Sequence, residues 1–242
     1  MNFALFVPRM DQRALFVGKT GCGKYWAARR ILQWQRHDDE CIDRCFDHPS
    51  IAKGTIALLP RRYVIAYDAK GLMRWPGFHR VTSFEALNRA ANNPKKFPKI
   101  IYAPNAKELR DENFHEKFFL LCYERGKTTA YVDEWYAVAR GLTYPPSAHA
   151  ILTRGREMGV SIVGSTQRPS GIPQAIMSEA DLFFAFHLKM PQDRKKIAEM
   201  IPVDGDEARN GDLLKPTTLK KTKFFFYLDG DDIVSGPHKL QG

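Results

Sequence analysis

The sequence predicts an α/β protein whose mostly parallel, twisted sheet is flanked by helices. Short apolar runs alternate with helix-like stretches along the chain, and this alternation implies parallel strands joined by right-handed crossovers. Runs such as Val160-Ser161-Ile162-Val163 suit strands that are buried on both faces of a sheet. A glycine-rich segment joins the first expected strand to the first expected helix. Ligands of such sheets bind at the carboxyl ends of the strands, so a functional site is expected there.

The alternation extends over most of the 242 residues, without a repeat, a low-complexity tract or an obvious linker. We therefore expect one domain over residues 1–242, with its motifs in residues 14–200 and a last strand with a basic tail in residues 201–242. The expected strands are Ala14–Val17, Tyr63–Tyr67, Lys99–Ala103, Thr129–Val132, Val160–Ser165, Leu182–His187 and Lys223–Leu228. The expected helices are Lys24–Gln35, Ser83–Ala91, Asn113–Arg125, Ser147–Met158 and Gln192–Met200.

Composition indicates a globular protein with a polyanionic partner. Hydrophobic residues make up 44% of the chain and charged residues 26%, which is ordinary for a soluble domain. No apolar run approaches the roughly 18 residues that cross a bilayer, and the N-terminus lacks the basic start of a signal peptide, so we expect a cytoplasmic protein. The net charge of +10 favours a polyanionic partner, and a solvated surface of mixed charge is an equally consistent alternative. The late basic residues are Lys189, Arg194, Lys195, Lys196, Lys215, Lys220, Lys221 and Lys223.

The glycine-rich segment is typical of a phosphate-binding loop, but it lacks one expected residue. The pattern G-x-x-x-x-G-K-[ST] fits from Gly18 to Lys24, and Tyr25 then stands where Ser or Thr belongs. Glycine lets the backbone wrap an anion, the amides and the helix start face it, and Lys24 adds a point charge at the β- and γ-phosphates. The missing hydroxyl normally binds Mg²⁺. The expected nucleotide-binding residues are Gly18, Lys19, Thr20, Gly21, Cys22, Gly23, Lys24 and Tyr25.

Two carboxylates follow the apolar run Thr129–Val132. At a strand end, Asp133 can hold a metal ion or its waters, and Glu134 can polarise an attacking water as general base. The structural alternative is an acidic N-cap for the next helix. Gln167 closes the following strand, where its amide can bond both a γ-phosphate and a water. A simple turn ended by Pro169 is equally consistent there.

Two arginines and an aspartate complete the candidate residues. Arg154 and Arg156 lie near the end of the helix Ser147–Met158. Either guanidinium could stabilise charge on a transferring phosphoryl group, although basic residues also favour a helix C-terminus by themselves. Asp68 could support the nucleotide site, or only form a turn with Gly71.

His37, Cys41, Cys45 and His48 have the side-chain types of a zinc site. The first three residues are four apart and would share one face of a helix. Acidic residues crowd this segment and the usual CxxC spacing is absent, which favours a polar helix end and loop.

Together these motifs resemble the FtsK–HerA superfamily of DNA-pumping ATPases over roughly residues 12–200. Residues 18–24 match its GxTGxGK form, and Tyr67–Gly71 is similar to its D-x-K-G segment after the second strand. Tyr131–Glu134 matches its acidic strand. Residues 155–169, GREMGVSIVGSTQRP, are similar to its R-x-x-G-[IV]…[ST]-Q-R-P segment, and the likeness continues through residues 172–176 and 193–195.

The resemblance implies a RecA-like core, usually in a homohexameric ring that threads duplex DNA, with ATP and Mg²⁺ as cofactors. It implies that Lys24 holds phosphates, Glu134 activates water and Gln167 senses the γ-phosphate. Asp133 would hold Mg²⁺, directly or through water. Arg156 is the implied finger that reaches the neighbouring subunit's site, with Arg154 as second candidate. The implied supporting residues are Asp68 and Lys70.

The expected ATPase motifs span most of the chain, so the chain looks most like the genome-packaging ATPases of membrane-containing icosahedral phages and archaeal viruses. The implied partners are double-stranded DNA, bound without sequence preference, and capsid vertex or portal proteins. The implied location is the host cytoplasm or a packaging vertex of the virion. Candidate pore loops are Leu72–Arg80 and Gly141–Ser147.

Two alternatives stay open. Because Tyr25 replaces the usual Mg²⁺ ligand, the chain could be a nucleotide-binding assembly or scaffold protein with little turnover. A filamentous-phage assembly or export ATPase shares the phosphate loop, but such proteins normally carry a membrane span, and no run in this sequence is long enough.

Overall fold

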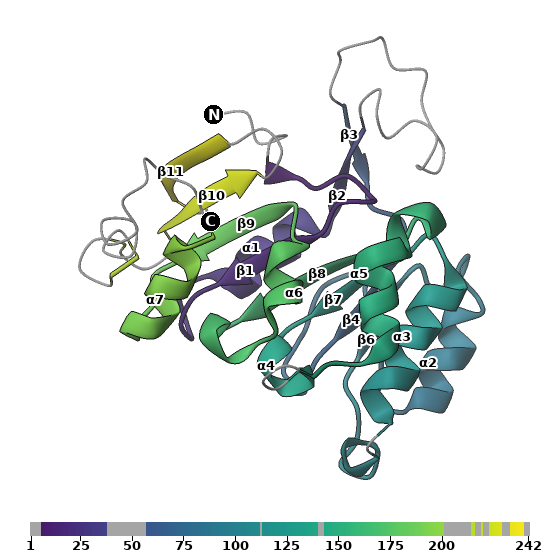
Figure 1. Cartoon of the computed structure of the whole chain (residues 1–242). Helices are drawn as coiled ribbons and strands as arrows, with labels where there is room; N and C mark the ends of the chain where they lie inside the picture. Colours follow the sequence, from purple (N-terminus) through teal and green to yellow (C-terminus); the bar gives the residue numbers. More distant parts are fainter. Residues whose placement is uncertain are drawn as a thin grey trace. The chain divides into compact units, whose positions relative to one another are not determined.

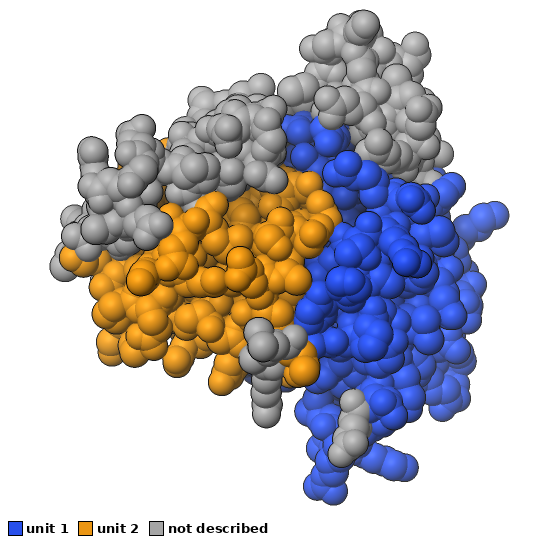
Figure 2. Space-filling model, viewed as in Figure 1, with its two compact units in different colours: residues 1–12, 29–133, 144–163 blue, residues 13–28, 134–143, 164–242 orange. Residues whose placement is uncertain are grey.

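The structure, a computed structural model, describes residues 6–37, 57–111, 113–139, 143–200, 214–215, 219, 223–228 and 233–239. The predicted fold class is confirmed, because the described residues include nine strands of a mostly parallel sheet, with helices beside it (Figure 1). The chain divides into two compact units (Figure 2). The first unit contains residues 1–12, 29–133 and 144–163, and the second contains residues 13–28, 134–143 and 164–242.

Four parallel strands run through the first unit in the order β7-β4-β6-β5. Every residue of β4 (Val64–Tyr67) is buried, as expected for an inner strand that is covered on both faces. A separate antiparallel pair joins β2 to β3. The bounds of these other strands are Trp34–His37 for β2, Ala57–Pro60 for β3, His79–Val81 for β5, Lys99–Tyr102 for β6 and Thr129–Val132 for β7.

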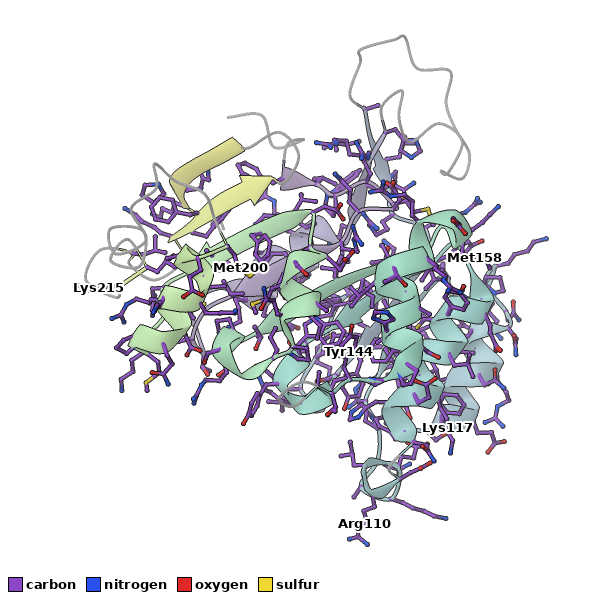
Figure 3. The ribbon with its side chains drawn as sticks, in the orientation of Figure 1. Arg110, Lys117, Tyr144, Met158, Met200 and Lys215 are labelled. Atoms are coloured by element: carbon purple, nitrogen blue, oxygen red, sulfur yellow. The ribbon has the colours of Figure 1, made fainter. Side chains whose placement is uncertain are left out.

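The helices of the first unit begin and end where local signals predict. α2 begins after Ser83, whose hydroxyl accepts a hydrogen bond from the amide of Ala86 at 3.2 Å. α5 ends at Gly159, which adopts the left-handed conformation. Arg110, in the 3-10 turn η2, extends away from the strands (Figure 3). The bounds are Phe84–Ala91 for α2, Glu108–Arg110 for η2, Phe114–Arg125 for α3 and Pro146–Met158 for α5.

The second unit is built on the parallel pair of β1 (Ala14–Val17) and β9 (Leu182–Phe186). The strand order is β11-β10-β9-β1, and both added strands run antiparallel to their neighbours. Phe16 and Phe184 stack with ring centres 4.4 Å apart, which binds β1 to β9 through side chains as well as backbone. The remaining elements are α4 (Trp135–Val138), η3 (Pro169–Gly171), α6 (Gln174–Ser178), α7 (Pro191–Ala198), β10 (Lys223–Leu228) and β11 (Ile233–Lys239).

Two elements take residues from both units along the chain. α1 (Lys24–Ile31) begins in the second unit, and β8 (Ser161–Thr166) ends there. The phosphate loop, the start of α1 and the end of β8 therefore all belong to the second unit.

The expected helix from Lys24 to Gln35 is too long. α1 ends at Ile31, and residues 34–37 form β2, in which Gln35 pairs with Leu59. This partner lies 24 residues further along the chain, so helical periodicity within the segment does not reveal the strand. The short strands β3 and β5 also escaped prediction, as did the seven-residue strand β11 and the short helices α4 and α6.

The helix expected at His37, both for a zinc site and for the favoured polar helix end, is not present there. This residue lies in β2 rather than on a helix, and its Nε2 is 2.8 Å from Nε2 of Gln35. The other three candidates, Cys41, Cys45 and His48, lie outside the described residues. Among the residues that are described, no group of histidine, cysteine and acidic side chains is arranged to hold a metal ion. In the same part of the chain, no helix is both long and apolar enough to cross a bilayer.

Candidate nucleotide site

The phosphate loop is held between the ends of two strands of the second unit. The amide of Gly18 donates to the carbonyl of Thr166 at 3.2 Å, and the amide of Lys19 donates to the carbonyl of His187 at 3.1 Å. Gly18 is required by both conformation and space. Its φ is 152°, and a Cβ atom at this position would lie 2.6 Å from Cβ of Phe186.

The next four amides of the loop are available to an anion. Within the described residues, the backbone N–H groups of Thr20, Gly21, Cys22 and Gly23 donate to no backbone carbonyl. They precede the N-terminus of α1, where the helix dipole adds positive potential. This arrangement is the one in which backbone amides bind phosphate.

Lys24 turns back over its own loop. Its ammonium donates to the carbonyl of Gly18 and, at 2.9 Å, to the carbonyl of Lys19, and the side chain is mostly buried. Burial raises the pKa of the neighbouring Cys22 thiol, and the charge of Lys24 opposes this rise. Cys22 is therefore a neutral thiol that fills space under the loop, and the positive charge of the site comes from the lysines.

Glu134 presents one carboxylate oxygen to the backbone and leaves the other one open. Its Oε1 accepts from the amide of Gln167 at 3.2 Å and from the amide of Tyr136 at 3.4 Å. Its Oε2 has no hydrogen bond within the described residues, and the residue as a whole is buried. The acidic N-cap that was the structural alternative is thus present, since Glu134 caps α4. The cap uses one oxygen only, so it does not exclude a role as base.

Gln167 connects the end of β8 to the phosphate loop. Its Oε1 accepts from the hydroxyl of Thr20 at 2.5 Å, while its backbone amide binds Glu134. One residue therefore touches both the loop and the predicted base. This position is what a residue needs in order to couple the state of a bound phosphate to the position of Glu134.

Two glycines allow α4 to lie directly against the strand and turn that carry Gln167. A Cβ atom at Gly164 would lie 2.0 Å from Nε1 of Trp135, and one at Gly171 would lie 2.8 Å from Cε2 of Tyr136. Trp135 is fully buried. Because Trp135 follows Glu134 directly, its packing places the carboxylate beside the end of β8.

The turn after Gln167 has an ionic anchor. Asp193, buried in α7, accepts from the amide and the hydroxyl of Ser170 at 3.1 Å and 2.6 Å. Its Oδ2 also lies 3.7 Å from Nε of Arg168. These contacts hold residues 168–170, so they limit the movement of Gln167.

Three other predicted residues lie in the first unit. Asp133 has its Oδ2 3.8 Å from Nζ of Lys70, and its Oδ1 accepts from the hydroxyl of Tyr131 at 3.4 Å. Asp68 accepts from the amides of Met73 and Lys70 at 2.7 Å and 3.3 Å, and it is buried. Asp68 therefore forms the turn that was its structural alternative. Roles for Asp68, Lys70 and Asp133 at a nucleotide stay predictions.

The two candidate finger arginines differ in their surroundings. Arg156 has its Nε 3.4 Å from Oδ2 of the buried Asp11, and about half of its side chain is exposed. Arg154 is exposed, and it makes no hydrogen bond or ion pair within the described residues. Both lie on α5 in the first unit. Their action on a neighbouring subunit stays a prediction.

Tyr25 is the second residue of α1 and is half-buried. Its place in the sequence, directly after Lys24, is the one that the hydroxyl ligand of Mg²⁺ takes in the usual loop. The sequence therefore differs from the usual pattern only at Tyr25, in the first turn of α1. The loop residues whose amides would face an anion match the pattern.

Comparison with known proteins points to one group. No protein-family model matches the chain. The DNA packaging ATPase P9 of Enterobacteria phage PRD1 is 27% identical over 225 residues, which cover 91% of this chain and 84% of that protein. The chain is similar to viral genome-packaging ATPases. This confirms the resemblance that the motifs indicated.

Solved structures show the same fold. The genome packaging NTPase B204 of Sulfolobus turreted icosahedral virus 2, in complex with AMPPCP, has a TM-score of 0.66 at 17% identity, over 96% of this chain and 100% of that chain. B204 of Sulfolobus turreted icosahedral virus has a TM-score of 0.63 at 16% identity, over 96% and 98%. At these identities the likeness establishes the P-loop NTPase fold.

Sequence reasoning missed the residues that place the site rather than those that act in it. Trp135, Gly164 and Asp193 were not predicted to have such roles. An isolated glycine inside a strand signals a close approach of another group, and Gly164 carried that signal. Nothing in the sequence identifies the tryptophan that meets it.

The contact between Trp135 and Gly164 yields a testable expectation. The variant Gly164→Ala should lose about 1–3 kcal/mol of unfolding free energy, because its methyl overlaps the indole. Trp135→Ala removes that indole, so the double variant should be less destabilised than the sum of the two single variants. Urea unfolding measures all four proteins of the cycle. Additive losses would show that the two residues do not meet.

Proposed function

We propose that this protein is an ATP-driven double-stranded DNA translocase, the motor that packages a viral genome into a preformed capsid. The observation that carries the proposal is the convergence, within one unit, of an anion-binding loop, an activating carboxylate and a linking glutamine. Similarity to the DNA packaging ATPase P9 of phage PRD1 supports an ATPase that acts in packaging. The fold shared with the B204 packaging NTPases, solved with ATP analogues and AMP, supports nucleotide binding.

The second unit supplies the groups that hydrolysis of ATP requires. The four available amides and Lys24 would bind the phosphates and stabilise the charge that develops in the transition state. Glu134 would accept a proton from the attacking water at Oε2, while Oε1 stays bonded to the backbone. Gln167 would bond the γ-phosphate or the water, and it would exchange its contact with Thr20 on binding or release.

A Mg²⁺ ion would be held mainly by phosphates and water. Mg²⁺ at nucleotides commonly uses one or two carboxylates with several waters, and Asp133 is the carboxylate that adjoins Glu134 in the chain. Bound Mg²⁺ would neutralise phosphate charge in the transition state. Lys70, which lies beside Asp133, would have to move or share that carboxylate.

The proposal includes a homohexameric ring with sites completed by a neighbouring subunit. Arg156 and Arg154 are the candidate residues, because a guanidinium added from a second subunit stabilises transferred phosphoryl groups. The chain would act in the host cytoplasm or at the packaging vertex, where portal or capsid vertex proteins would meet the ring.

Duplex DNA would be held through its phosphates. On α7, Lys195 is exposed and Lys196 is half-exposed. In the first unit, the segment Leu72–Arg80 begins with a leucine that is 75% exposed, and it remains the candidate pore loop that the structure describes throughout. Residues 141 and 142 of the second candidate lie outside the described residues. Phosphate contacts carry no sequence information, which suits a motor.

Replacing the predicted base tests the enzymatic part of the proposal. Glu134→Gln keeps an oxygen that can cap α4 but removes the basic carboxylate, so kcat for ATP hydrolysis should fall at least about 100-fold. Affinity for a non-hydrolysable ATP analogue should change little. Glu124→Gln, an exposed carboxylate on α3, is the matched control and should retain full activity. Undiminished hydrolysis in Glu134→Gln would sink the assignment.

The salt dependence of DNA binding tests the role of α7. Each lysine that contacts a phosphate contributes about 0.9 to the slope of log Kobs against log salt, so the variant Lys195→Ala/Lys196→Ala should lower the slope by about 2. Duplexes of unrelated sequence should behave alike. Lys95→Ala/Lys96→Ala, an exposed pair in the first unit, is the control. A slope that does not change, or changes equally in both variants, would refute the contact.

A nucleotide-binding assembly protein with little turnover is the second candidate function, and Tyr25 is the observation that favours it. Under the packaging proposal, Asp133, waters and phosphates suffice for Mg²⁺, so Tyr25→Thr should raise kcat by no more than a fewfold. Under the alternative, the wild type would bind ATP and turn over slowly, and Tyr25→Thr would restore hydrolysis by 10-fold or more, on the order of a recovered metal ligand. Steady-state phosphate release with varied Mg²⁺ separates the two.

A further inference from the structure

His187 is a buried histidine at the edge of the phosphate loop, and at least one of its two ring nitrogens lacks a partner. It follows the last residue of β9, and its backbone carbonyl accepts the amide of Lys19. Only 4% of the residue is exposed. Neither Nδ1 nor Nε2 makes a hydrogen bond of good geometry within the described residues, and the backbone of Leu219 is the group that lies near enough to bond one of them. Buried polar atoms are nearly always bonded, and an unmade hydrogen bond costs about 1–3 kcal/mol, so this ring calls for an explanation.

The surroundings of His187 indicate an anion as the missing partner. Burial lowers the pKa of the imidazole, and the charges of Lys19 and Lys24 lower it further. The backbone of Leu219 acts in the opposite sense. Among the described residues, no acidic side chain contributes to the shift. The ring is therefore neutral at pH 7, beside two ammonium groups that a polyanion would neutralise.

We propose that His187 is a contact residue for the polyphosphate of a bound nucleotide, and that it takes up a proton when the polyphosphate enters the loop. The inference rests on the nucleotide-binding part of the proposed function. The phosphate charge would cancel the field of Lys19 and Lys24 at the ring. The imidazolium would then donate one N–H to a phosphate oxygen, and the proton would come from the solvent.

The position of His187 supports the choice of phosphate over base or ribose. The lysine that it meets through its carbonyl is the second residue of the loop, and the other acting charge is Lys24, the residue that ends the motif. Both charges belong to the phosphate-binding part of the site. A charge-assisted hydrogen bond to phosphate is stronger than a neutral one, and it satisfies a nitrogen that is otherwise buried without a partner.

Nucleotide titrations test the contact. With His187→Asn and His187→Gln, affinity for ADP and for the ATP analogue AMPPCP should fall about tenfold or more, as for loss of a bond to a charged group. Affinity for AMP should not change, because AMP lacks the β- and γ-phosphates. His149→Asn, at an exposed histidine, should leave all three affinities unchanged. Unchanged affinities in both His187 variants, or an equal loss for AMP, would overturn the proposal.

Proton uptake gives a second readout that a structural role would not move. Calorimetric titrations of ADP at pH 6.5, in buffers of different ionisation enthalpy, should show more protons taken up by the wild type than by His187→Gln. The difference cancels protons released by the nucleotide itself. Equal proton numbers in the two proteins would overturn the proposal. If the wild type binds none of the three nucleotides, the proposed function itself fails and this inference fails with it. If it binds them and the His187 variants bind equally well, only the inference fails.

Discussion

The contact between Trp135 and Gly164 is the constraint on which the site of the second unit depends. It requires a position without a Cβ atom on β8 and a buried indole on α4. Glu134 precedes Trp135, and Gln167 follows the end of β8, so this contact brings the carboxylate within hydrogen-bonding distance of the glutamine amide. Gln167 then reaches Thr20 in the phosphate loop. The carboxylate of Glu134, the amide of Gln167 and the glycine-rich loop become one arrangement through packing.

The charged and neutral groups around the phosphate loop favour the binding of an anion. The loop combines amide donors with the exposed Lys19 and the buried Lys24, and a neutral thiol at Cys22 and a neutral ring at His187 lie beside them. Such a concentration of positive potential is stabilised when a polyanion binds. The anion would satisfy the amides, the ammonium groups and the imidazole together. This accounts for the loop amides that, within the described residues, donate to no backbone carbonyl.

Much of the fold was predictable because the strands β1, β4, β7, β8 and β9 are buried along their whole length. β1, β7 and β10 have the predicted bounds, and most helices begin within one residue of the expected position. Most errors arose where pairing is distant in sequence or the element is short, although β11 has seven residues and pairs with the preceding strand β10. Residues 34–37 leave a helical pattern because they pair with residues 57–60. Sequence also proposed Glu134 and Gln167 through motif resemblance, and the structure places them together. The sequence could not reveal the residues that hold Glu134 and Gln167 in place, because the contacts of Trp135 with Gly164 and of Asp193 with Ser170 depend on tertiary packing. Nor could one chain show which arginine meets a second subunit.

The central claim is that this arrangement hydrolyses ATP and does not merely bind it. The most direct measurement is the steady-state rate of phosphate release by the unmodified protein, with ATP, with and without Mg²⁺, as duplex DNA is titrated. The account predicts Mg²⁺-dependent turnover that duplex DNA stimulates. Saturable binding of ATP with no phosphate release above background, at any concentration of Mg²⁺ or DNA, would contradict it.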